Sequence, residues 1–529
     1  MAEPLMATSR LDALTSWHAD WRNLRVVVLG LGLTGFSVAD TLVELGADVL
    51  VVADSASDER AQLTQVIGAA LHLGGTADEQ RERVEAFDPE LVVVSPGYHP
   101  DHPLLVAAAD DGVAIWGDIE LAWRVRDKVG EPAEWIGVTG TNGKTTTVGL
   151  TAAMLRESGK RVAAVGNIGA PVLDAVRYPE GFDVLVVELS SYQLHWMRGV
   201  SPLASAVLNI ADDHLDWHGS AEAYAAAKGR VYENTRVACV YNLADPVTRR
   251  LVEDAEVVEG ARAVGFGLGI PGPSDFGVVE GILVDRAFLD ERRDSALEII
   301  TVDELRVLGL DAPHVVANIL AAAALARAAG APLDAVRRAL ASFRLDPHRI
   351  EVVADRGGIR WIDDSKATNP HAADASLGAY ENVVWVVGGL LKGVDIGDLV
   401  KRRAERLRAA IVIGEDRLDV LSAFERHAPD LPLFEVVSGD TEEVMQAVVR
   451  MAAAAARPGD VVLLAPAAAS MDQFRDYAHR GERFAEAVAQ LLDETAPEQA
   501  TAPEEEGRDD RGTAGPPSDD PGPAERREP

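Results

Sequence analysis

The hydrophobic positions of this chain fall into short β-branched runs that end in Gly, Asp, Ser or Pro, with helix-like stretches between them. The first runs are RVVVLGLGL (25–33), DVLVVAD (48–54) and LVVVSPG (91–97). Such runs, alternating with helical patterns, predict α/β units with a mostly parallel sheet. The alternation returns with WIGVTG, VAAVG, DVLVVEL and ASAVLNI, and again with IRWIDD, VVWVVGG, AAIVIGE and DVVLLAP.

The pattern therefore divides the 529 residues into three α/β domains with an extension at each end. We expect an N-terminal extension (1–23), a first domain (24–130), a second (131–345), a third (346–495) and a tail (496–529). The Gly- and Pro-rich span 263–300 predicts additional β structure inside the second domain. The tail is almost free of apolar residues and rich in Pro, Gly, Glu and Asp, which predicts disorder.

The bulk composition narrows the class of protein. A net charge of −35 repels phosphodiester backbones and argues against a nucleic-acid binder. The single cysteine, Cys239, cannot form an internal disulfide, which fits a reducing compartment. The N-terminus has no signal-peptide pattern, and the most apolar helical stretch, ANILAAAALARAAG, carries Arg327 and reads as a packed helix. We expect a cytoplasmic protein with no membrane insertion.

Lysine is scarce, with seven residues against 43 arginines. A lysine beside Gly, Ser or Thr after a predicted strand is therefore a candidate for a chemical role. Lys144, Lys366 and Lys392 lie beside Gly, Ser or Thr after predicted strands, and Lys228 lies within an Ala-rich helical stretch. A solvated surface lysine is the ordinary alternative at each position. A need for a primary amine, which arginine cannot meet, is the functional one.

The stretch WIGVTGTNGKTTTVGL (135–150) predicts a strand, a phosphate-binding loop and a helix. It matches a Walker-type loop in part, because Gly143-Lys144-Thr145 is present but Val138 occupies the position of the first glycine. Backbone N–H groups and Lys144 would hold phosphate oxygens, and Thr145 would bind Mg²⁺. Glu188, at the end of the strand-like run 184–187, is a second candidate Mg²⁺ ligand. The alternatives are a helix-capping turn and an ordinary strand-end carboxylate.

Further polar clusters follow other predicted strands, and each has two readings. The loop LNIADDHLDWHG could hold a cation or be a solvated acidic loop; its candidate ligands are Asp212, Asp213, His214, Asp216 and His218. Gly30-Leu31-Gly32-Leu33-Thr34-Gly35 with Asp54 fits a dinucleotide fingerprint, although related nucleotides use the same cradle and a tight turn would look alike. In the third domain IDDSKATNP, Lys392, Ser470 and Tyr477 could clamp an anion or be ordinary loops.

Together these stretches resemble the Mur ligase family, from about Leu24 to Leu492. GTNGKTT is shared with folylpolyglutamate synthetases, whereas ELSSYQL, DDSKATNP and ASMDQF resemble the members that add D-glutamate. The resemblance implies an N-terminal Rossmann-like UDP-binding domain, a central P-loop-type ATPase with a parallel sheet, and a C-terminal Rossmann-like domain that binds the amino acid. It implies a monomer with ATP, two Mg²⁺ ions and a carbamylated lysine.

The activity implied by the resemblance belongs to peptidoglycan precursor synthesis. The substrates would be UDP-N-acetylmuramoyl-L-alanine and D-glutamate, joined through an acyl phosphate and a tetrahedral intermediate. A carboxylate is a poor acyl donor, and phosphorylation supplies the leaving group, while Mg²⁺ and lysines neutralise the charge. A folylpolyglutamate synthetase-like ligase, an NAD-dependent oxidoreductase and a catalytically silent nucleotide-binding regulator are the alternatives.

The resemblance also assigns residues by matching position. For ATP they are Gly140, Thr141, Asn142, Gly143, Lys144, Thr145, Thr146, Asn318, Arg349 and Asp364. The catalytic set is Lys144, Glu188, His214 and Lys228, and the metal ligands are Thr145, Glu188, His214 and, once carbamylated, Lys228. For the UDP-sugar they are Leu33, Thr34, Asp54, Ser55, Ser95 and Asn167. For D-glutamate they are Lys366, Thr368, Lys392, Ser470 and Tyr477.

Two positions depart from the family pattern. The family often reads His-Asn-x-x-Asn where this chain has His314, Val315 and Asn318, so one amide expected on the adenine side is absent. Tyr477 stands where phenylalanine is frequent. Neither departure touches the acyl-phosphate chemistry.

Overall fold

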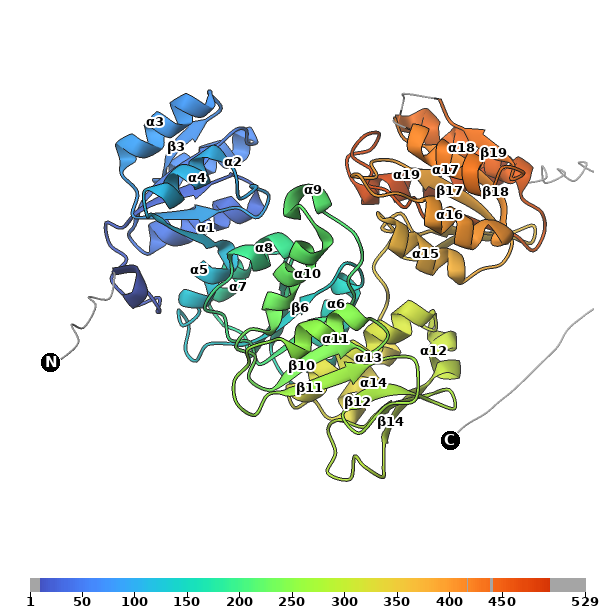
Figure 1. Ribbon diagram of the computed structural model, residues 1–529, viewed down its shortest axis with the longest axis horizontal. Helices are drawn as coiled ribbons and strands as arrows, with labels where there is room; N and C mark the ends of the chain where they lie inside the picture. Colours follow the sequence, from blue (N-terminus) through green and yellow to red (C-terminus); the bar gives the residue numbers. More distant parts are fainter. Residues whose placement is uncertain (1–9, 416, 438–440, 495–529) are drawn as a thin grey trace, which may run out of the picture.

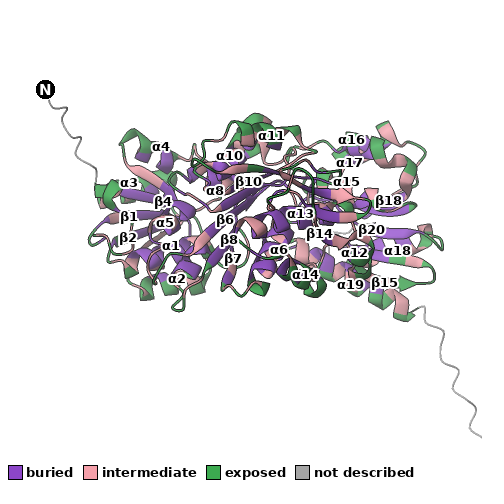
Figure 2. Ribbon diagram, turned by 90° about the horizontal axis from the view of Figure 1, so that it is seen from below, coloured by how far each residue is buried: buried purple, intermediate pink, exposed green. Residues whose placement is uncertain are grey.

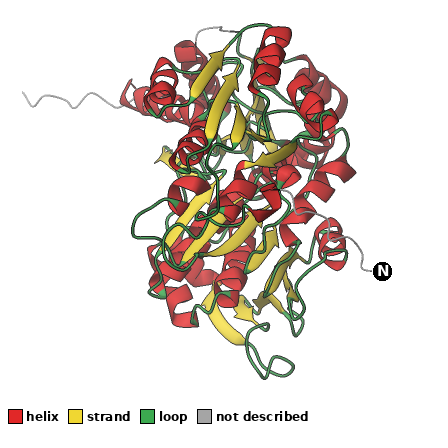
Figure 3. Ribbon diagram, turned by 90° about the vertical axis from the view of Figure 1, so that its left-hand side faces the viewer, coloured by secondary structure: helices red, strands yellow, loops and turns green. Residues whose placement is uncertain are grey.

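A computed structural model, which describes residues 10–415, 417–437 and 441–494, contains three α/β domains. Figure 1 shows the first and third domains on opposite sides of the central one. Seen from the side of the first domain, yellow strands lie among the red helices that surround them (Figure 3). The prediction of three α/β domains is confirmed. The tail predicted to be disordered lies outside the described residues.

The first domain has a five-stranded sheet of order β3-β2-β1-β4-β5 in which every pairing is parallel. Its strands are β1 (Arg25–Leu29), β2 (Asp48–Ala53), β3 (Ala70–Leu73), β4 (Leu91–Val94) and β5 (Ala114–Gly117). Its helices are α1 (Leu33–Glu44), α2 (Asp58–Val66), α3 (Ala77–Phe87), α4 (Pro103–Asp110) and α5 (Asp118–Arg124). Within the N-terminal extension, a 3-10 turn (Arg10–Ala13) precedes Leu14 and Trp21, which are buried in this domain's core.

The central domain has a nine-stranded sheet of order β14-β13-β12-β11-β10-β9-β6-β8-β7. Strands β6 to β12 pair in parallel, whereas β13 and β14 are antiparallel additions that confirm the β structure predicted for 263–300. The strands are β6 (Glu134–Thr139), β7 (Val162–Gly166), β8 (Val184–Glu188), β9 (Ala204–Val207), β10 (Ala238–Asn242), β11 (Arg262–Phe266), β12 (Asp275–Val279), β13 (Ile282–Asp285) and β14 (Leu297–Thr301).

Helices α6, α13 and α14 pack together against the central sheet. The helices of this domain are α6 (Lys144–Glu157), α7 (Val172–Val176), α8 (Ser191–Trp196), α9 (Leu215–His218), α10 (Ala221–Gly229), α11 (Pro246–Glu253), α12 (Val302–Leu308), α13 (Pro313–Ala328) and α14 (Leu333–Ser342), with a 3-10 turn, η2 (Arg230–Tyr232). Most of α13 is buried, as predicted for the Ala-rich stretch. Among the described residues no single helix is long and apolar enough to cross a membrane, although the pair α12 and α13, bent by 107°, passes on length and composition.

The third domain has a six-stranded sheet of order β15-β16-β20-β17-β18-β19, parallel except for the β15–β16 pair. The strands are β15 (Glu351–Arg356), β16 (Ile359–Asp363), β17 (Val383–Gly388), β18 (Leu407–Ile413), β19 (Leu433–Glu435) and β20 (Val461–Leu464). The helices are α15 (Pro370–Gly378), α16 (Gly397–Arg403), α17 (Leu418–His427), α18 (Thr441–Ala455) and α19 (Tyr477–Glu494), with a 3-10 turn, η3 (Ala404–Arg406).

The hydrophobic cores are distributed unevenly among the domains. One buried cluster runs from Val26 and Leu42 of the first domain into Leu194 and Val231 of the central domain. The two clusters of the third domain contain residues of that domain alone. Figure 2 shows the buried strands forming the interior of the row of domains. The first and central domains therefore share apolar contacts, whereas the third domain has separate cores.

Candidate active site

The phosphate loop between β6 and α6 has the backbone geometry that its glycines predict. Gly140 and Gly143 have φ values of 150° and 85°, a region that L side chains rarely adopt. A Cβ on Gly143 would also lie 2.5 Å from Oδ1 of Asn318. Helix α6 then begins at Lys144 with no side-chain cap, so its first N–H groups remain available to an anion.

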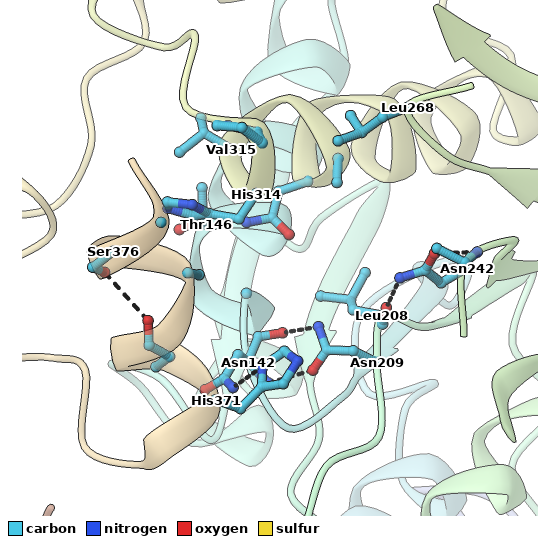
Figure 4. A pocket seen from close by; sticks show the side chains of 18 of the residues that line it. Asn142, Thr146, Leu208, Asn209, Asn242, Leu268, His314, Val315, His371 and Ser376 are labelled. Atoms are coloured by element: carbon cyan, nitrogen blue, oxygen red, sulfur yellow. Dashed lines mark hydrogen bonds between the residues drawn. The ribbon is translucent and has the colours of Figure 1, made fainter. Parts of the chain in front are cut away.

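Asn209, just after β9, fixes the shape of this loop. Its Oδ1 accepts from the backbone N of Asn142 at 2.9 Å, and its Nδ2 donates to the carbonyl of Asn142 at 3.0 Å (Figure 4). The backbone of Asn209 also accepts from the N–H of Thr141 at 2.9 Å. The strand next to β6 therefore holds the loop rigidly from one side.

Lys144 and Lys228 approach the same loop from two helices. The Lys144 ammonium donates to the carbonyls of Gly140 and Thr141 at 2.8 and 2.9 Å. Lys228, at the end of α10 and only 2 % exposed, donates to the Gly140 carbonyl at 3.0 Å. Burial lowers the pKa of Lys144, and burial together with the charge of Lys144 holds the pKa of Lys228 well below its usual value. Lys228 is therefore biased toward the neutral amine.

Glu188, at the end of β8, has an unsatisfied carboxylate oxygen. The side chain is 3 % exposed; Oε1 accepts from Nδ2 of Asn167 at 3.0 Å, and the buried Oε2 has no hydrogen-bond partner among the described residues. A buried anionic oxygen without a partner is costly. This environment suits a cation bound between Glu188 and the start of α6, where Thr145 lies.

His214 is the N-cap of α9 and has a left-handed backbone, at φ 53°. Its Nδ1 lies 2.6 Å from the hydroxyl of Tyr192, which fixes the ring. Burial lowers the pKa of His214, the charge of Asp213 opposes this shift, and the charges of Lys392 and Lys144 add to it. The imidazole is therefore favoured in its neutral, metal-binding form.

The acidic loop 212–218 does not form a metal cage by itself. His218 turns its Nε2 to the hydroxyl of Ser191, at 2.9 Å. Within the described chain, the group of His and carboxylate residues that comes close enough for a shared ion is His348, Glu351 and Asp363, elsewhere in the fold. Among the candidate ligands of this loop, His214 is the one whose ring nitrogen lies at hydrogen-bond distance from the hydroxyl of Tyr192.

A cavity of about 820 Å³ lies between the central and third domains. Its walls bring together members of the predicted ATP set from both domains, namely Asn142, Gly143, Thr146, Asn318, Arg349 and Asp364. Figure 4 shows Asn142, Thr146, Val315 and His371 around this space. Val315 lines the wall where the family pattern has an amide.

The third domain contributes Asp364 and Lys366 to the cavity wall. Asp364 accepts from the hydroxyl of Ser376, and burial raises the pKa of Asp364 to about 7. Lys366 lies with its Nζ 5.1 Å from the ring centroid of Tyr477. Burial, assisted by the charge of Arg349, lowers the pKa of Lys366 to about 8.

The other predicted D-glutamate residues lie on neighbouring loops of the same domain. Thr368 follows Lys366, and the buried Ser470 is on the loop after β20. Lys392 is exposed on the loop after β17, at φ 53°. Because β16, β20 and β17 are adjacent and parallel, these loops leave the same edge of the sheet.

The predicted UDP-sugar residues of the first domain share one edge of its parallel sheet. Leu33 and Thr34 begin α1, Asp54 and Ser55 follow β2, and Ser95 follows β4. A Cβ on Gly30 would lie 2.8 Å from Oγ of Ser95, whereas Gly32 at the start of α1 faces open space. Asn167 lies apart from this set, in the central domain, where its amide holds Glu188.

Comparison with known proteins covers all three domains. The MurD-like N-terminal domain of the Mur ligases matches residues 24–117, the Mur ligase middle domain matches 138–326, and the Mur ligase glutamate ligase domain matches 348–468. The chain belongs to the Mur ligase family. The G-x-G-x-x-G motif of this Mur ligase falls within the first match, which favours a ligase domain over the oxidoreductase alternative.

Curated relatives align with nearly the whole Mur ligase chain. The UDP-N-acetylmuramoylalanine–D-glutamate ligase of Leifsonia xyli is 66 % identical over 91 % of this chain and 96 % of its own. That of Streptomyces avermitilis is 53 % identical over 89 % of this chain and 99 % of its own. A pseudomurein peptide ligase from Methanothermus fervidus, 18 % identical, shares the fold with a TM-score of 0.53, covering 88 % of this chain and 100 % of its own.

Sequence reasoning missed several residues that hold this Mur ligase's site together. Asn209 lies inside the quoted LNIADDH stretch, but nothing local marks its amide as the brace of another loop. Asn369, the last residue of SKATN, belongs to the IDDSKATNP stretch considered as an anion clamp, but its contact with Asn142 was not predicted. His371 was missed altogether, and Nδ2 of Asn142 lies 3.2 Å from both Asn369 Oδ1 and His371 Nδ1. These contacts join segments that are distant in the sequence. The sequence predicted the strands that precede these segments, but not which of the loops would lie together.

Proposed function

We propose that this Mur ligase joins D-glutamate to the carboxylate of UDP-N-acetylmuramoyl-L-alanine, with ATP converted to ADP and phosphate. The observation that carries the proposal is the convergence of the phosphate loop, Glu188 and Lys228 at one edge of the central sheet. The names of the relatives, at up to 66 % identity, support the choice of D-glutamate and of the UDP-sugar. A folylpolyglutamate synthetase-like activity is the alternative.

The residues at the phosphate loop fit Mg²⁺. The unpartnered Oε2 of Glu188 and the hydroxyl of Thr145 are hard oxygen ligands of the kind this ion prefers. Mg²⁺ bound there would neutralise charge on the phosphate oxygens. Lys144 and the free N–H groups of α6 bind the same oxygens.

The reaction has two steps in this proposal. An oxygen of the alanyl carboxylate attacks the γ-phosphorus of ATP, the bond to the β-phosphate oxygen breaks, and ADP leaves. The amine of D-glutamate then attacks the carbonyl carbon of the acyl phosphate. The tetrahedral intermediate expels phosphate, the nitrogen loses a proton, and an amide remains. Lys144, on the phosphate loop, stabilises the negative charge through the first step.

Lys228 is proposed to carry a carbamate. Its neutral amine would attack the carbon of CO₂, and the nitrogen would lose one proton to give a carboxylate. That carboxylate, with His214, would supply ligands for a second Mg²⁺. The lowered pKa and burial of Lys228 favour the neutral nucleophile that this chemistry needs.

The substrate positions follow the same proposal. The UDP-sugar would lie along the first domain's strand edge toward Asn167, and D-glutamate along the loops with Lys366, Ser470 and Tyr477. Lys392 and Thr368 complete the amino-acid site. We further propose a monomer that acts in the cytoplasm in peptidoglycan precursor synthesis.

Phosphate release by the purified protein tests the proposal. The assay contains ATP, Mg²⁺ and UDP-N-acetylmuramoyl-L-alanine, with D-glutamate, L-glutamate, glycine or no amine. We expect release that requires D-glutamate and a product heavier by one glutamyl unit. Release that requires a folate acceptor instead would favour the alternative, and no release with any amine would refute the ligase assignment.

A further inference from the structure

Arg480, in the first turn of α19, is a fully buried arginine, 0 % exposed. Its Nε donates to Oγ of Ser365 at 2.9 Å, its Nη2 to the carbonyl of Ser365 at 2.8 Å, and its Nη1 to the carbonyl of Ala468 at 3.1 Å. Among the described residues no carboxylate lies within ion-pair distance of this guanidinium. Burying a guanidinium without an ion-pair partner costs free energy, which its hydrogen bonds must offset.

The acceptors of Arg480 belong to the loops that carry the candidate amino-acid site. Ser365 follows β16 and immediately precedes Lys366, whereas Ala468 follows β20 and precedes Ser470 by two residues. The hydroxyl of Ser365 also donates to the carbonyl of Tyr477, at 2.7 Å. One guanidinium and one hydroxyl therefore join the segments that carry Lys366, Ser470 and Tyr477.

The depth of α19 is set by the next residue, Gly481. A Cβ at this position would lie 2.2 Å from Nδ1 of His348 and 2.5 Å from Oδ2 of Asp363. Those two side chains are hydrogen-bonded at 2.7 Å, and Oδ1 of Asp363 accepts from the N–H of Ser365 at 2.8 Å. The helix can approach this network only because residue 481 has no side chain, and this close approach brings Arg480 to the loops.

We infer that Arg480 is a positioning residue that sets the separation of the Ser365 and Ala468 loops and thereby the affinity for the amino-acid substrate. The inference rests on the proposed function, in which these loops bind D-glutamate. It requires the planar fork of arginine, because a lysine ammonium cannot donate to all three acceptors in the same directions. Arg480 acts through Ser365 and Ala468 and does not contact substrate.

The test is the kinetics of Arg480→Lys with each substrate varied in turn. We expect KM for D-glutamate to rise about tenfold, with kcat within about threefold and KM for ATP within about twofold of wild type, because one or two charged hydrogen bonds are lost in the third domain alone. Ser365→Ala keeps the backbone acceptor and loses only the hydroxyl, so it should raise KM for D-glutamate by about threefold. This milder variant carries the test if Arg480→Lys does not fold.

Arg327→Lys is the matched control. Arg327 in α13 is another largely buried arginine, with donors to the carboxylate of Asp285 and to the carbonyls of Ala331 and Phe288. It should lower thermal stability without a selective change in KM for D-glutamate. An unchanged KM in both Arg480→Lys and Ser365→Ala, or equal rises for all three substrates, would overturn the inference. Wild-type protein without D-glutamate-dependent phosphate release would refute the proposed function itself, and the inference with it.

Discussion

Lysines from two domains act on one imidazole. Burial lowers the pKa of His214, and the charges of Lys392 in the third domain and of Lys144 on the phosphate loop act in the same direction, against the charge of Asp213. Lys228 itself is buried, and burial together with the charge of Lys144 holds its pKa well below its usual value. The presence of a lysine at position 228, in a chain that otherwise favours arginine, is thus explained by a need for an amine that can become neutral.

Replacing Lys228 tests this reading directly. Lys228→Ala should lower turnover by about a hundredfold or more, because the variant cannot form the carbamate proposed to bind the second Mg²⁺. Short carboxylates such as acetate should restore part of the activity by replacing the carbamate. Lys228→Arg stays protonated and should be neither active nor rescued. Parent-level turnover of Lys228→Arg, measured by phosphate release, would exclude a carbamate.

Lys366 predicts a pH effect on amino-acid binding. Its pKa is lowered to about 8, so the free protein carries the charged amine below that pH and loses it as pH rises. The value of kcat/KM for D-glutamate is measured for wild type and for Lys366→Gln, and the first is divided by the second. The titration of the substrate amine affects both values equally and cancels in this ratio. This ratio should fall between pH 7 and pH 9, approaching tenfold per unit above about pH 8. A ratio independent of pH would remove Lys366 from the amino-acid site.

At the scale of single residues, the sequence singled out candidate chemical groups more readily than the residues that support them. Lys144, Glu188 and Lys228, which the structure places near the same loop, each stand out against a local pattern of Gly, strand or Ala-rich helix. Arg480 and Asn209 were missed because each acts through hydrogen bonds to groups that are distant in the sequence. An arginine in a chain with 43 arginines carries no local signal of burial.

At the scale of elements, strands were predictable and their partners were not. The runs at β1, β6, β8 and β20 are largely buried on both faces, and each appears in the sequence as a mostly apolar segment. The edge strands β3 and β19 are only partly buried and were not recognised. The order of strands, which brings the loops after β16 and β20 together, depends on crossovers that the pattern does not encode.

Helix α15 offers a test of contact between elements. Its N-cap, Asn369, accepts from the N–H of Ala372 at 2.9 Å and donates to Oδ1 of Asn142 at 3.0 Å, while Asn142 donates back at 3.2 Å. Asn369→Ser should keep the cap, because serine is a good N-cap, but it is too short to reach Asn142. We expect KM for ATP to rise about tenfold with little change in the melting temperature.

Asn369→Ala is the comparison for this prediction. It loses both the cap and the contact, so its stability should fall by a further ~1 kcal/mol, measured by thermal unfolding. If Asn369→Ser leaves the KM for ATP unchanged, the contact between α15 and the phosphate loop has no part in nucleotide binding.

At the scale of the whole molecule, the distribution of apolar burial separates the third domain from the other two. The first and central domains share one continuous cluster, whereas the third has cores of its own and meets the phosphate loop through polar side chains such as Asn369 and His371. Polar interfaces of this kind permit relative domain motion. The segment that joins the domains includes His348 and Ile350 at φ 63° and 49°, the latter strained for a β-branched residue.

Calorimetry should resolve this division. Because no apolar core is shared across the boundary in the described part of the chain, we expect the third domain to unfold in a transition separate from that of the first and central domains. In the proposed function a non-hydrolysable ATP analogue would bind between the central and third domains, so it should raise the transition of the less stable unit and bring the two together. Arg480→Lys should lower only the third domain's transition, and Arg327→Lys only the other. A single transition whose calorimetric and van't Hoff enthalpies agree, in the absence of nucleotide, would mean that polar contacts alone couple the three domains into one cooperative unit.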